Sequence, residues 1–388
     1  MAVRYINVRS KVDMFSPVVR ATGNVAVIGT ATAGTDNKVV PVTDPSVAAK
    51  EFGPATLPDP NDPNRVRPNS SLTAALTTLF GQTPGPAQVW AVKAAGTAPG
   101  AVGDPTTALA AIEELDVQFV VLAATPLDDT SGADSGAIGK LAQHVTQVSN
   151  FGGEGKERMG VVMLVKDADD PAVVTGKSKL VSSRMIYIAH RSDDDAAAAV
   201  AGTIAGYPPH ISVLLKQVAI TSEPFSVTSI DKLNKGEQFG DPPQGNGINW
   251  LARPALIPGG GVYLGEGYTG NPADMKFIDV RRTVDDIAFK LKARLIRGIG
   301  NLRISRSGLR ALVVQMEAVL DPLVRDEVIE SYSIDIPVLD LLDGDPAALT
   351  PAQLQIIQDA QADRVAQILV SVDYAGAIHR LALTLNFT

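Results

Sequence analysis

The chain contains no cysteine, and it is poor in aromatic residues and histidine. Its 388 residues include 4 histidines and 5% aromatic residues. Without cysteine, disulfides, thiolate metal sites and cysteine nucleophiles are excluded. With so few aromatic side chains, alanine, valine, glycine and leucine must form most of the core.

The sequence also lacks a long apolar run. Residues 1–11 contain no apolar segment of the kind found in a secretory signal. The longest stretch without formal charge, Ala196–Leu215, is rich in alanine and glycine and is interrupted by Pro208 and Pro209. We therefore expect no membrane insertion and a protein that is assembled in the cytoplasm.

The overall composition is that of a globular protein with one unusually basic segment. Apolar residues make up 45% of the chain and charged residues 20%, and the length allows two or three domains. The net charge of −8 argues against binding to nucleic acid. Residues 281–310, however, hold nine Lys/Arg and two Asp, so this segment carries +7 and the rest of the chain −15.

Helical and strand patterns alternate between residues 71 and 206. Continuous apolar runs such as QFVVLAA and GVVMLV are typical of strands that are covered on both faces. Their alternation with helices predicts a largely parallel sheet with helices on both sides. The expected fold is therefore a parallel-rich α/β body followed by an α+β C-terminal domain.

The predicted divisions are an N-terminal arm (1–20), the α/β domain (21–212), an irregular connector (213–257), the C-terminal core (258–376) and a C-terminal strand arm (377–388). The proline-rich segment from Phe52 to Ser70 reads as a surface insertion.

In the C-terminal domain, Lys276–Val280 is expected to be a strand that leads into an amphipathic helix. Apolar residues at helical spacing, namely Val284, Ile287, Ala288, Leu291 and Leu295, would face the core. A second helix should start at Ser307 and kink or end at Pro322. Tyr332–Leu339 and Val365–Val372 are expected to be strands. Thr350 with Pro351 behind it predicts the start of another helix.

The first of these helices carries a basic stripe. Lys290, Arg294 and Arg297 follow one another at helical spacing. This pattern fits either contact with an acidic partner surface or an ordinary solvated helix face.

Both ends of the chain contain segments with strand character. The N-terminal segment includes Val3, Tyr5, Ile6 and Val8. The C-terminal segment begins at Ile378 and places Leu381, Leu383, Leu385 and Phe387 on one face. Such strands join either the sheet of their own domain or the sheet of another chain.

Motifs for catalysis or cofactors are weak. The segment Gly265–Gly270 matches GxGxxG, so a doubly wound nucleotide-binding enzyme that uses the Gly-rich loop 259–270 is the alternative function. A dinucleotide site would need a long helix directly after the glycines, whereas Asn271 and Pro272 follow them. Gly176-Lys177-Ser178 resembles the end of a P-loop, but Pro171 occupies the position of its first glycine.

Proteolytic and metal sites also have little support. None of His144, His190, His210 and His379 lies in a subtilisin-type sequence context. The acidic clusters Asp167–Asp170 and Asp193–Asp195 could bind Ca²⁺ or Mg²⁺. The favoured interpretation of the second cluster is a helix start with Ser192 as N-cap. We expect no catalytic residues, no cofactor and no metal.

Several motifs in order resemble the contractile tail sheath proteins of myovirus tails, R-type pyocins and related injection systems. An apolar strand ends in Gly29-Thr30-Ala31, a Val/Pro link follows at 39–42, and Phe52-Gly53 forms a turn before a helix. A Gly-rich strand at 261–265 precedes the Arg281-Arg282 pair and its helix. The family's Trp-Gly-Ala-Arg-Thr motif is here Leu-Gly-Glu-Gly-Tyr, so only its glycine, Gly265, carries over.

The resemblance implies a structural subunit with a subtilisin-like body. Such subunits form stacked hexameric rings around an inner tube, and their contraction drives that tube through a target membrane. The terminal strands would exchange with neighbouring copies. The other expected partners are the inner tail tube protein and the baseplate and tail terminator proteins of a virion tail or injection particle. Lys290, Arg294 and Arg297 would then face the inner tube.

Overall fold

The structure, a computed structural model, describes residues 21–96, 99–150, 155–237 and 241–380. The chain forms two compact units. Of the described residues, the α/β unit comprises 21–286 and 376–380, and the C-terminal unit comprises Ile287–Ala375. In sequence, the C-terminal unit is thus an insertion in the α/β unit. Within the described part of the chain, no helix is both long and apolar enough to span a membrane.

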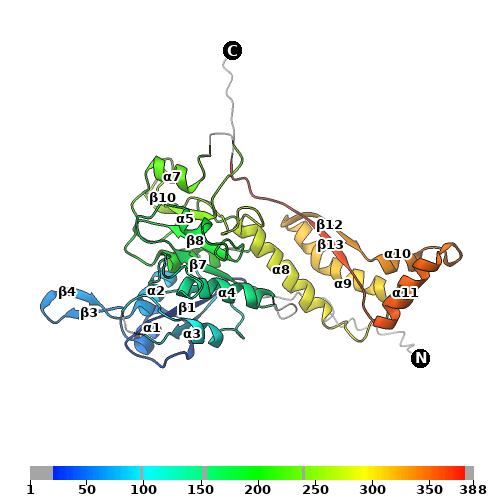
Figure 1. Ribbon diagram of the computed structural model, residues 1–388, viewed down its shortest axis with the longest axis horizontal. Helices are drawn as coiled ribbons and strands as arrows, with labels where there is room; N and C mark the ends of the chain where they lie inside the picture. The colour runs from blue at the N-terminus through cyan, green and yellow to red at the C-terminus, as the bar shows by residue number, and fades with distance from the viewer. Residues whose placement is uncertain (1–20, 97–98, 151–154, 238–240, 381–388) are drawn as a thin grey trace, which may run out of the picture. The chain divides into compact units, whose positions relative to one another are not determined.

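A nine-stranded mixed sheet forms the centre of the α/β unit (Figure 1). The strand order is β2-β5-β1-β6-β7-β8-β10-β11-β9. The six strands from β5 to β10 are parallel, and β2, β11 and β9 run antiparallel to their neighbours. The strands are β1 (Asn24–Gly29), β2 (Val39–Val42), β5 (Gln88–Lys93), β6 (Phe119–Leu122), β7 (Met159–Met163), β8 (Met185–Ala189), β9 (Gln217–Val218), β10 (Ile248–Ala252) and β11 (Val262–Leu264). The predicted parallel-rich α/β body is confirmed.

Helices cover both faces of this sheet. Those that pack on one face are α1 (Pro45–Phe52), α2 (Ser71–Phe80) and α6 (Ala196–Ala205). Those on the other face are α3 (Thr106–Ala111), α4 (Ala137–Asn150), α5 (Ala172–Thr175) and α7 (Val227–Leu233). Along β1, Val25 and Val27 belong to the first core while Ala26 and Ile28 belong to the second. Because successive strand residues point to opposite faces, an apolar run is required wherever both faces are buried.

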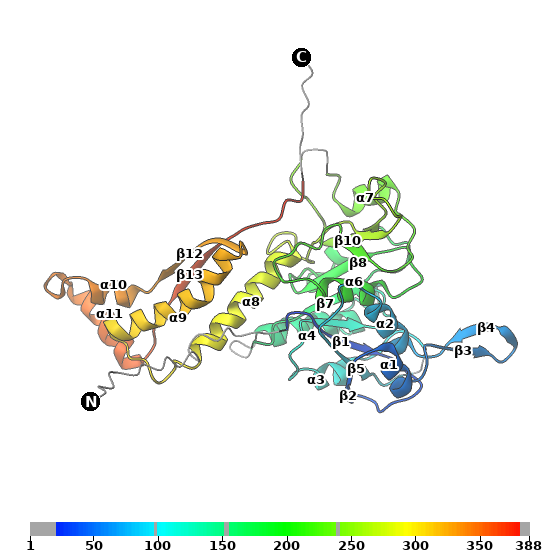
Figure 2. The same ribbon diagram turned by 180° about the vertical axis from the view of Figure 1, so that it is seen from behind.

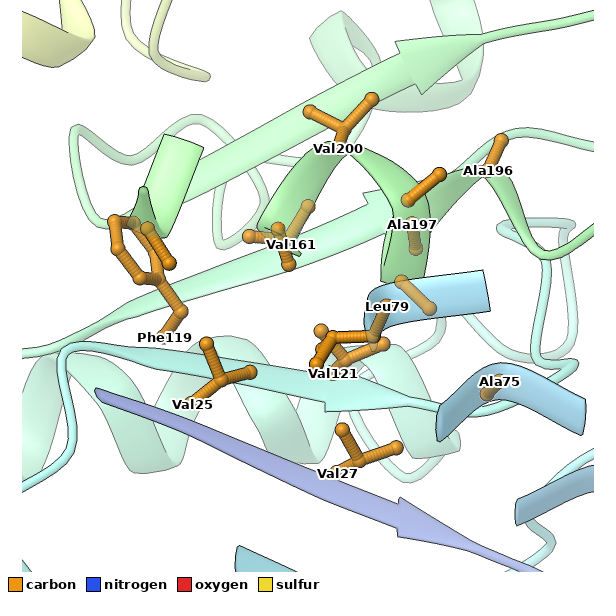
Figure 3. Close-up of a cluster of buried hydrophobic side chains, with 14 of the residues drawn as sticks. Val25, Val27, Ala75, Leu79, Phe119, Val121, Val161, Ala196, Ala197 and Val200 are labelled. Carbon is orange, nitrogen blue, oxygen red and sulfur yellow. The ribbon is translucent and has the colours of Figure 1, made fainter. Parts of the chain in front are cut away.

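The first core is built from branched strand residues and small helical ones. Figure 3 shows Val25, Val121 and Val161 of neighbouring strands beneath Ala197 and Val200 of α6. All ten residues of α6 are buried. Its alanines allow the helix axis to lie close to the sheet, and Gly202 lets it approach α2, where a Cβ would meet the Leu79 carbonyl oxygen at 2.6 Å.

The proline-rich insertion forms an antiparallel hairpin. Strands β3 (Thr56–Asp59) and β4 (Asp62–Pro68) pair with each other and with no other described strand. Both views show the hairpin projecting from the body of the α/β unit (Figures 1 and 2). Proline is tolerated here because neither strand has a second neighbour that needs its N–H.

The C-terminal unit packs helices against a two-stranded antiparallel sheet. Helix α8 (Ile278–Leu295) runs from the α/β unit into this one. The other elements are α9 (Arg306–Arg325), β12 (Ile329–Asp335), α10 (Pro337–Asp343), a 3₁₀ turn (Pro346–Ala348), α11 (Pro351–Asp363) and β13 (Leu369–Tyr374). The predicted cap is confirmed, since the Thr350 hydroxyl accepts from the Gln353 N–H and the Gln353 side chain accepts from the Thr350 N–H.

Several sequence expectations were wrong in detail. Residues 278–280 form the first turn of α8 rather than a strand, because Ile278 is buried in the sheet core and Phe277 makes only an isolated bridge to Tyr268. Strand β12 ends at Asp335, and Pro337 starts α10 instead of continuing the strand. Helix α9 does not end at Pro322, one of the two expected outcomes, but continues to Arg325. Helix α6 is capped by Asp195 and not by Ser192.

The predicted connector and boundary also differ from the structure. Residues 213–257 include β9, α7 and β10, and β10 is an integral strand of the main sheet. Strand β11 lies beyond the expected boundary at 258 and still belongs to that sheet. The compact units divide within α8, between Asp286 and Ile287. Glycine and proline in this region suggested loops, but long-range pairing with β8 makes 248–252 a strand.

Candidate functional site

The Arg-Arg pair at the start of α8 is part of the α/β unit. Arg281 forms an ion pair with Asp285 at 2.5 Å, and Arg184 approaches the same carboxylate, with Nη2 3.0 Å from Oδ1. All three side chains are 11–13% exposed. One carboxylate thus holds two guanidinium groups and joins the first turns of α8 to the segment before β8.

Arg282 is buried and bonds to backbone carbonyls instead of a carboxylate. Its guanidinium donates to the carbonyl oxygens of Tyr207 at 2.8 Å, Thr22 at 3.3 Å and Pro208 at 3.4 Å. Burial lowers the pKa of Arg282 to about 10, so the group stays charged at neutral pH. Since Thr22 lies just before β1, Arg282 fixes the place where the N-terminal segment enters the sheet.

The glycines of the GxGxxG segment serve close packing. A Cβ on Gly265 would lie 2.3 Å from Nε1 of Trp250, and one on Gly270 would lie 2.7 Å from the ring of Tyr187. Tyr268 and Thr269 between them are fully buried. The next helix, α8, starts only at Ile278. The nucleotide-binding interpretation is therefore not supported, because the glycines do not open a helix whose N-terminus could bind a phosphate.

A cluster of buried charges joins this segment to the chain after β13. Glu266 is fully buried, and its contacts with Arg380 and His379 both come from the segment after β13. Arg380 Nη2 lies 2.5 Å from Glu266 Oε1, and His379 Nδ1 lies 3.3 Å from Oε2. The Arg380 Nε also pairs with Glu237, whose side chain is 7% exposed.

Neutral contacts complete this cluster. His379 Nε2 lies 3.0 Å from the Ser212 hydroxyl, and the imidazole packs on Phe277 with 4.6 Å between ring centroids. Glu237 accepts from the Gln244 N–H at 3.1 Å and from the Asn234 amide at 3.0 Å. Although burial lowers the pKa of Arg380, the two carboxylates raise it, and Arg380 is a permanent cation here. Sequence reasoning missed Glu266 and Glu237, although a carboxylate between two glycines after an apolar strand was a usable signal.

The predicted basic stripe is only partly on the surface. Lys290 and Arg294 are partly buried in the C-terminal unit, whereas Arg297 is exposed just after the end of α8. Ile296 and Ile299 beside it are 63% and 76% exposed. Arg297 is therefore the member of the stripe that is most available for contact with another molecule. Val284, expected in the core, is exposed, while Ile287 is buried as predicted.

Most of the predicted arm residues lie outside the described part of the chain. This applies to Val3, Tyr5, Ile6 and Val8 and to Leu381, Leu383, Leu385 and Phe387. Ile378 is described and is 81% exposed. In the C-terminal unit, Val370 and Val372 of β13 face the helices while Ser371 and Asp373 face away.

The histidines and acidic clusters occupy structural positions. His144 and His190 are in the α/β unit, where burial lowers the pKa of both, that of His144 to about 4. Members of the acidic clusters pair with cations: Asp193 with Lys166 at 2.5 Å and Asp167 with Arg191 at 2.7 Å. Over the residues that the structure describes, no group of three or more His, Asp or Glu side chains could hold a metal ion.

Comparison with solved structures shows which known fold the chain shares. No protein-family model and no curated protein matches the sequence. Among solved structures, the helical sheath of the anti-feeding prophage in its contracted state is similar over 100% of this chain and 99% of its own, at 14% identity and a TM-score of 0.63. The chain has the contractile-sheath fold.

Two further structures support this sheath fold. The contracted PVC sheath complex of an extracellular contractile injection system covers 100% of this chain and 97% of its own, at 13% identity and a TM-score of 0.61. A sheath tail protein from Desulfitobacterium hafniense covers 86% and 93%, at 12% identity and a TM-score of 0.52. The sheath fold thus extends over both units.

Proposed function

We propose that the chain is the structural subunit of a contractile tail sheath. It polymerises as stacked hexameric rings around an inner tube and contracts to drive the tube through a target membrane. The observation that carries this proposal is the similarity to sheath structures over the full length of the chain. The α/β unit is then the subtilisin-like body of the subunit, without a catalytic role, because the energy for contraction is stored in the assembled lattice.

The subunits are linked by strand exchange. Within the described residues, β12 and β13 form a sheet of only two strands, and each strand has one edge without a described partner strand. An isolated strand pair is a weak structure, and unpaired edges accept further strands. The N- and C-terminal arms, 1–20 and 377–388, supply these strands to neighbouring copies by β-augmentation.

The basic segment around Lys290, Arg294 and Arg297 faces the inner tube. Exposed ion pairs contribute about 0–1 kcal/mol each, so such contacts release the tube readily. Baseplate and tail terminator proteins bind the two ends of the sheath. Assembly takes place in the cytoplasm, and the product is part of a virion tail or injection particle.

Electron microscopy of the purified chain tests the central proposal. Negatively stained samples at high concentration should contain hollow, striated tubes, because the sheath lattice is held together by contacts between identical subunits. A variant that ends at Arg380 lacks the exchanged strand and should remain folded but form no tubes. Ordered tubes from this truncated variant would contradict strand exchange by the C-terminal arm.

A charge reversal tests the tube-facing surface. Arg297→Glu is exposed and should leave folding intact while it reduces co-assembly with the inner tube protein. Arg67→Glu, on the exposed strand β4, is the matched control and should assemble normally. Normal sheath–tube particles from Arg297→Glu would show that this surface does not face the tube.

A further inference from the structure

The segment after β13 is held on the α/β unit by an ion-pair cluster in which Arg380 contacts both Glu237 and Glu266. The Glu266 side chain is 1% exposed; it forms an ion pair with Arg380, and its Oε2 lies 3.3 Å from Nδ1 of His379. A buried carboxylate that loses its cation is strongly destabilised. The seating of this segment and the burial of Glu266 are therefore one event.

The geometry favours a defined clamp over a chance surface contact. Arg380 uses Nε toward Glu237 and Nη2 toward Glu266, so two carboxylates from distant parts of the chain hold one planar guanidinium. Ion pairs from two nitrogen atoms of one guanidinium fix its orientation as well as its position. His379 adds a ring contact with Phe277 and a hydrogen bond with Ser212.

The position of this clamp in the chain gives it a role. The C-terminal unit leaves the α/β unit within α8, close to Arg282, and the chain returns at Gly376, directly before His379 and Arg380. Residues 381–388 follow immediately. Any force on the end of the chain must pass through the clamp before it reaches β13.

We propose that His379 and Arg380 are positioning residues, which lock the base of the C-terminal arm to the α/β unit through Glu266 and Glu237. This inference rests on the proposed sheath function for the use of the arm, but not for the existence of the lock. When a neighbouring copy binds the arm, the lock transmits the resulting force to the α/β unit. The sheet of β12 and β13 then does not bear that force.

Trypsin measures the lock directly in the unassembled full-length chain. Cleavage after Arg380 removes residues 381–388 and is followed by intact-mass spectrometry. The double variant Glu237→Gln/Glu266→Gln retains shape and hydrogen-bonding capacity but loses both charges. It should be cleaved after Arg380 at least ten times faster than the parent chain, while cleavage after the exposed Arg65 of the hairpin stays constant as the internal reference.

Two further variants keep the test decisive. Glu237→Gln alone preserves the Glu266 pairs and keeps the fold, so it should give an intermediate cleavage rate. Glu223→Gln changes an exposed carboxylate of the same unit and should match the parent. Cleavage of the double and single variants at the parental rate, with tryptophan fluorescence unchanged, would overturn the lock.

Assembly separates the failure of this inference from the failure of the proposed function. If the chain is a sheath subunit and the lock holds the arm, the double variant should form fewer and shorter tubes than the Glu223→Gln control. Faster cleavage with undiminished tubes would refute the role of the lock in transmitting force. If the parent chain forms no tubes under any condition, the sheath proposal fails, whereas the proteolysis still decides whether the lock exists.

Discussion

Arg158 is the largest fully buried side chain of the α/β unit, and its replacement by methionine gives a sharp test of the fold. The guanidinium donates to the carbonyl oxygens of Ile112, Glu113 and Leu115, each at 3.0 Å. These carbonyls follow the end of α3, where helix carbonyls lack intrahelical partners. Ile112 and Leu115 also accept a backbone N–H, from Leu115 and Val117 respectively, each at 3.1 Å, so Arg158 is a second donor to these two and the donor to Glu113. Arg158 therefore acts as an internal cap for α3 on the face opposite α6.

The size of the effect follows from what the substitution leaves behind. The Glu113 carbonyl loses its donor, which costs about 1–3 kcal/mol, while the Ile112 and Leu115 carbonyls keep a backbone donor and lose only a second bond of about 0.5–1.5 kcal/mol each. The loss is partly offset because methionine removes the desolvation penalty of a buried cation. We expect Arg158→Met to lower the free energy of unfolding by about 2–4 kcal/mol, a large part of the roughly 5–15 kcal/mol typical of a folded protein. Arg158→Lys keeps the charge but loses the planar fork, and should lose a smaller amount.

Urea unfolding at pH 7 measures this loss. Both tryptophans of the chain, Trp90 and Trp250, lie in the α/β unit, so fluorescence follows this unit alone. Arg65→Met on the exposed hairpin is the control and should change stability by less than about 0.5 kcal/mol. An Arg158→Met variant within about 1 kcal/mol of the parent would show that the carbonyls find other donors and that the capping argument is wrong.

Three further outcomes are expected. Burial, reinforced by the charge of Arg158, lowers the pKa of His144 from 6.5 to about 4, so the unfolded chain takes up this proton at a higher pH than the folded chain. The free energy of unfolding should therefore fall by up to roughly 3 kcal/mol as the pH drops from about 6.5 to 4. Urea unfolding at several pH values should show a smaller fall in the His144→Gln variant. Equal pH slopes in both proteins would contradict this sign. Gly265→Ala should destabilise the α/β unit by about 1–3 kcal/mol, since its Cβ collides with Trp250, and a fluorescence-monitored melt identical to that of the parent would refute the collision. Thr350→Ala should weaken α11 by about 1 kcal/mol and speed hydrogen exchange in its first turn, whereas unchanged exchange there would mean that the capping box contributes nothing.

The alternation of apolar runs with helical patterns was enough to predict the α/β body from sequence. Strands such as 119–122 and 159–163 are apolar at every position, and that pattern arises only where helices cover both faces of a sheet. The cap at Thr350 was also predictable, because a capping box needs only residues three apart in sequence. The family resemblance rested on short motifs in the right order, and the full-length similarity to sheath structures agrees with it.

The tertiary structure alone decided which charged residues are functional partners of one another. The sequence indicated Arg281 and Arg282 as a pair. Arg281 has a local partner, Asp285 on the same helix, but Arg184, which shares that carboxylate, and the three carbonyls that bind Arg282 come from distant segments. Glu266 lies 113 positions from His379, and no local period relates them. Strand β10 and the start of α8 were missed for the same reason. Hydrophobic periodicity reports which face of an element is buried, whereas the partner that buries it is set by contacts far away in the chain.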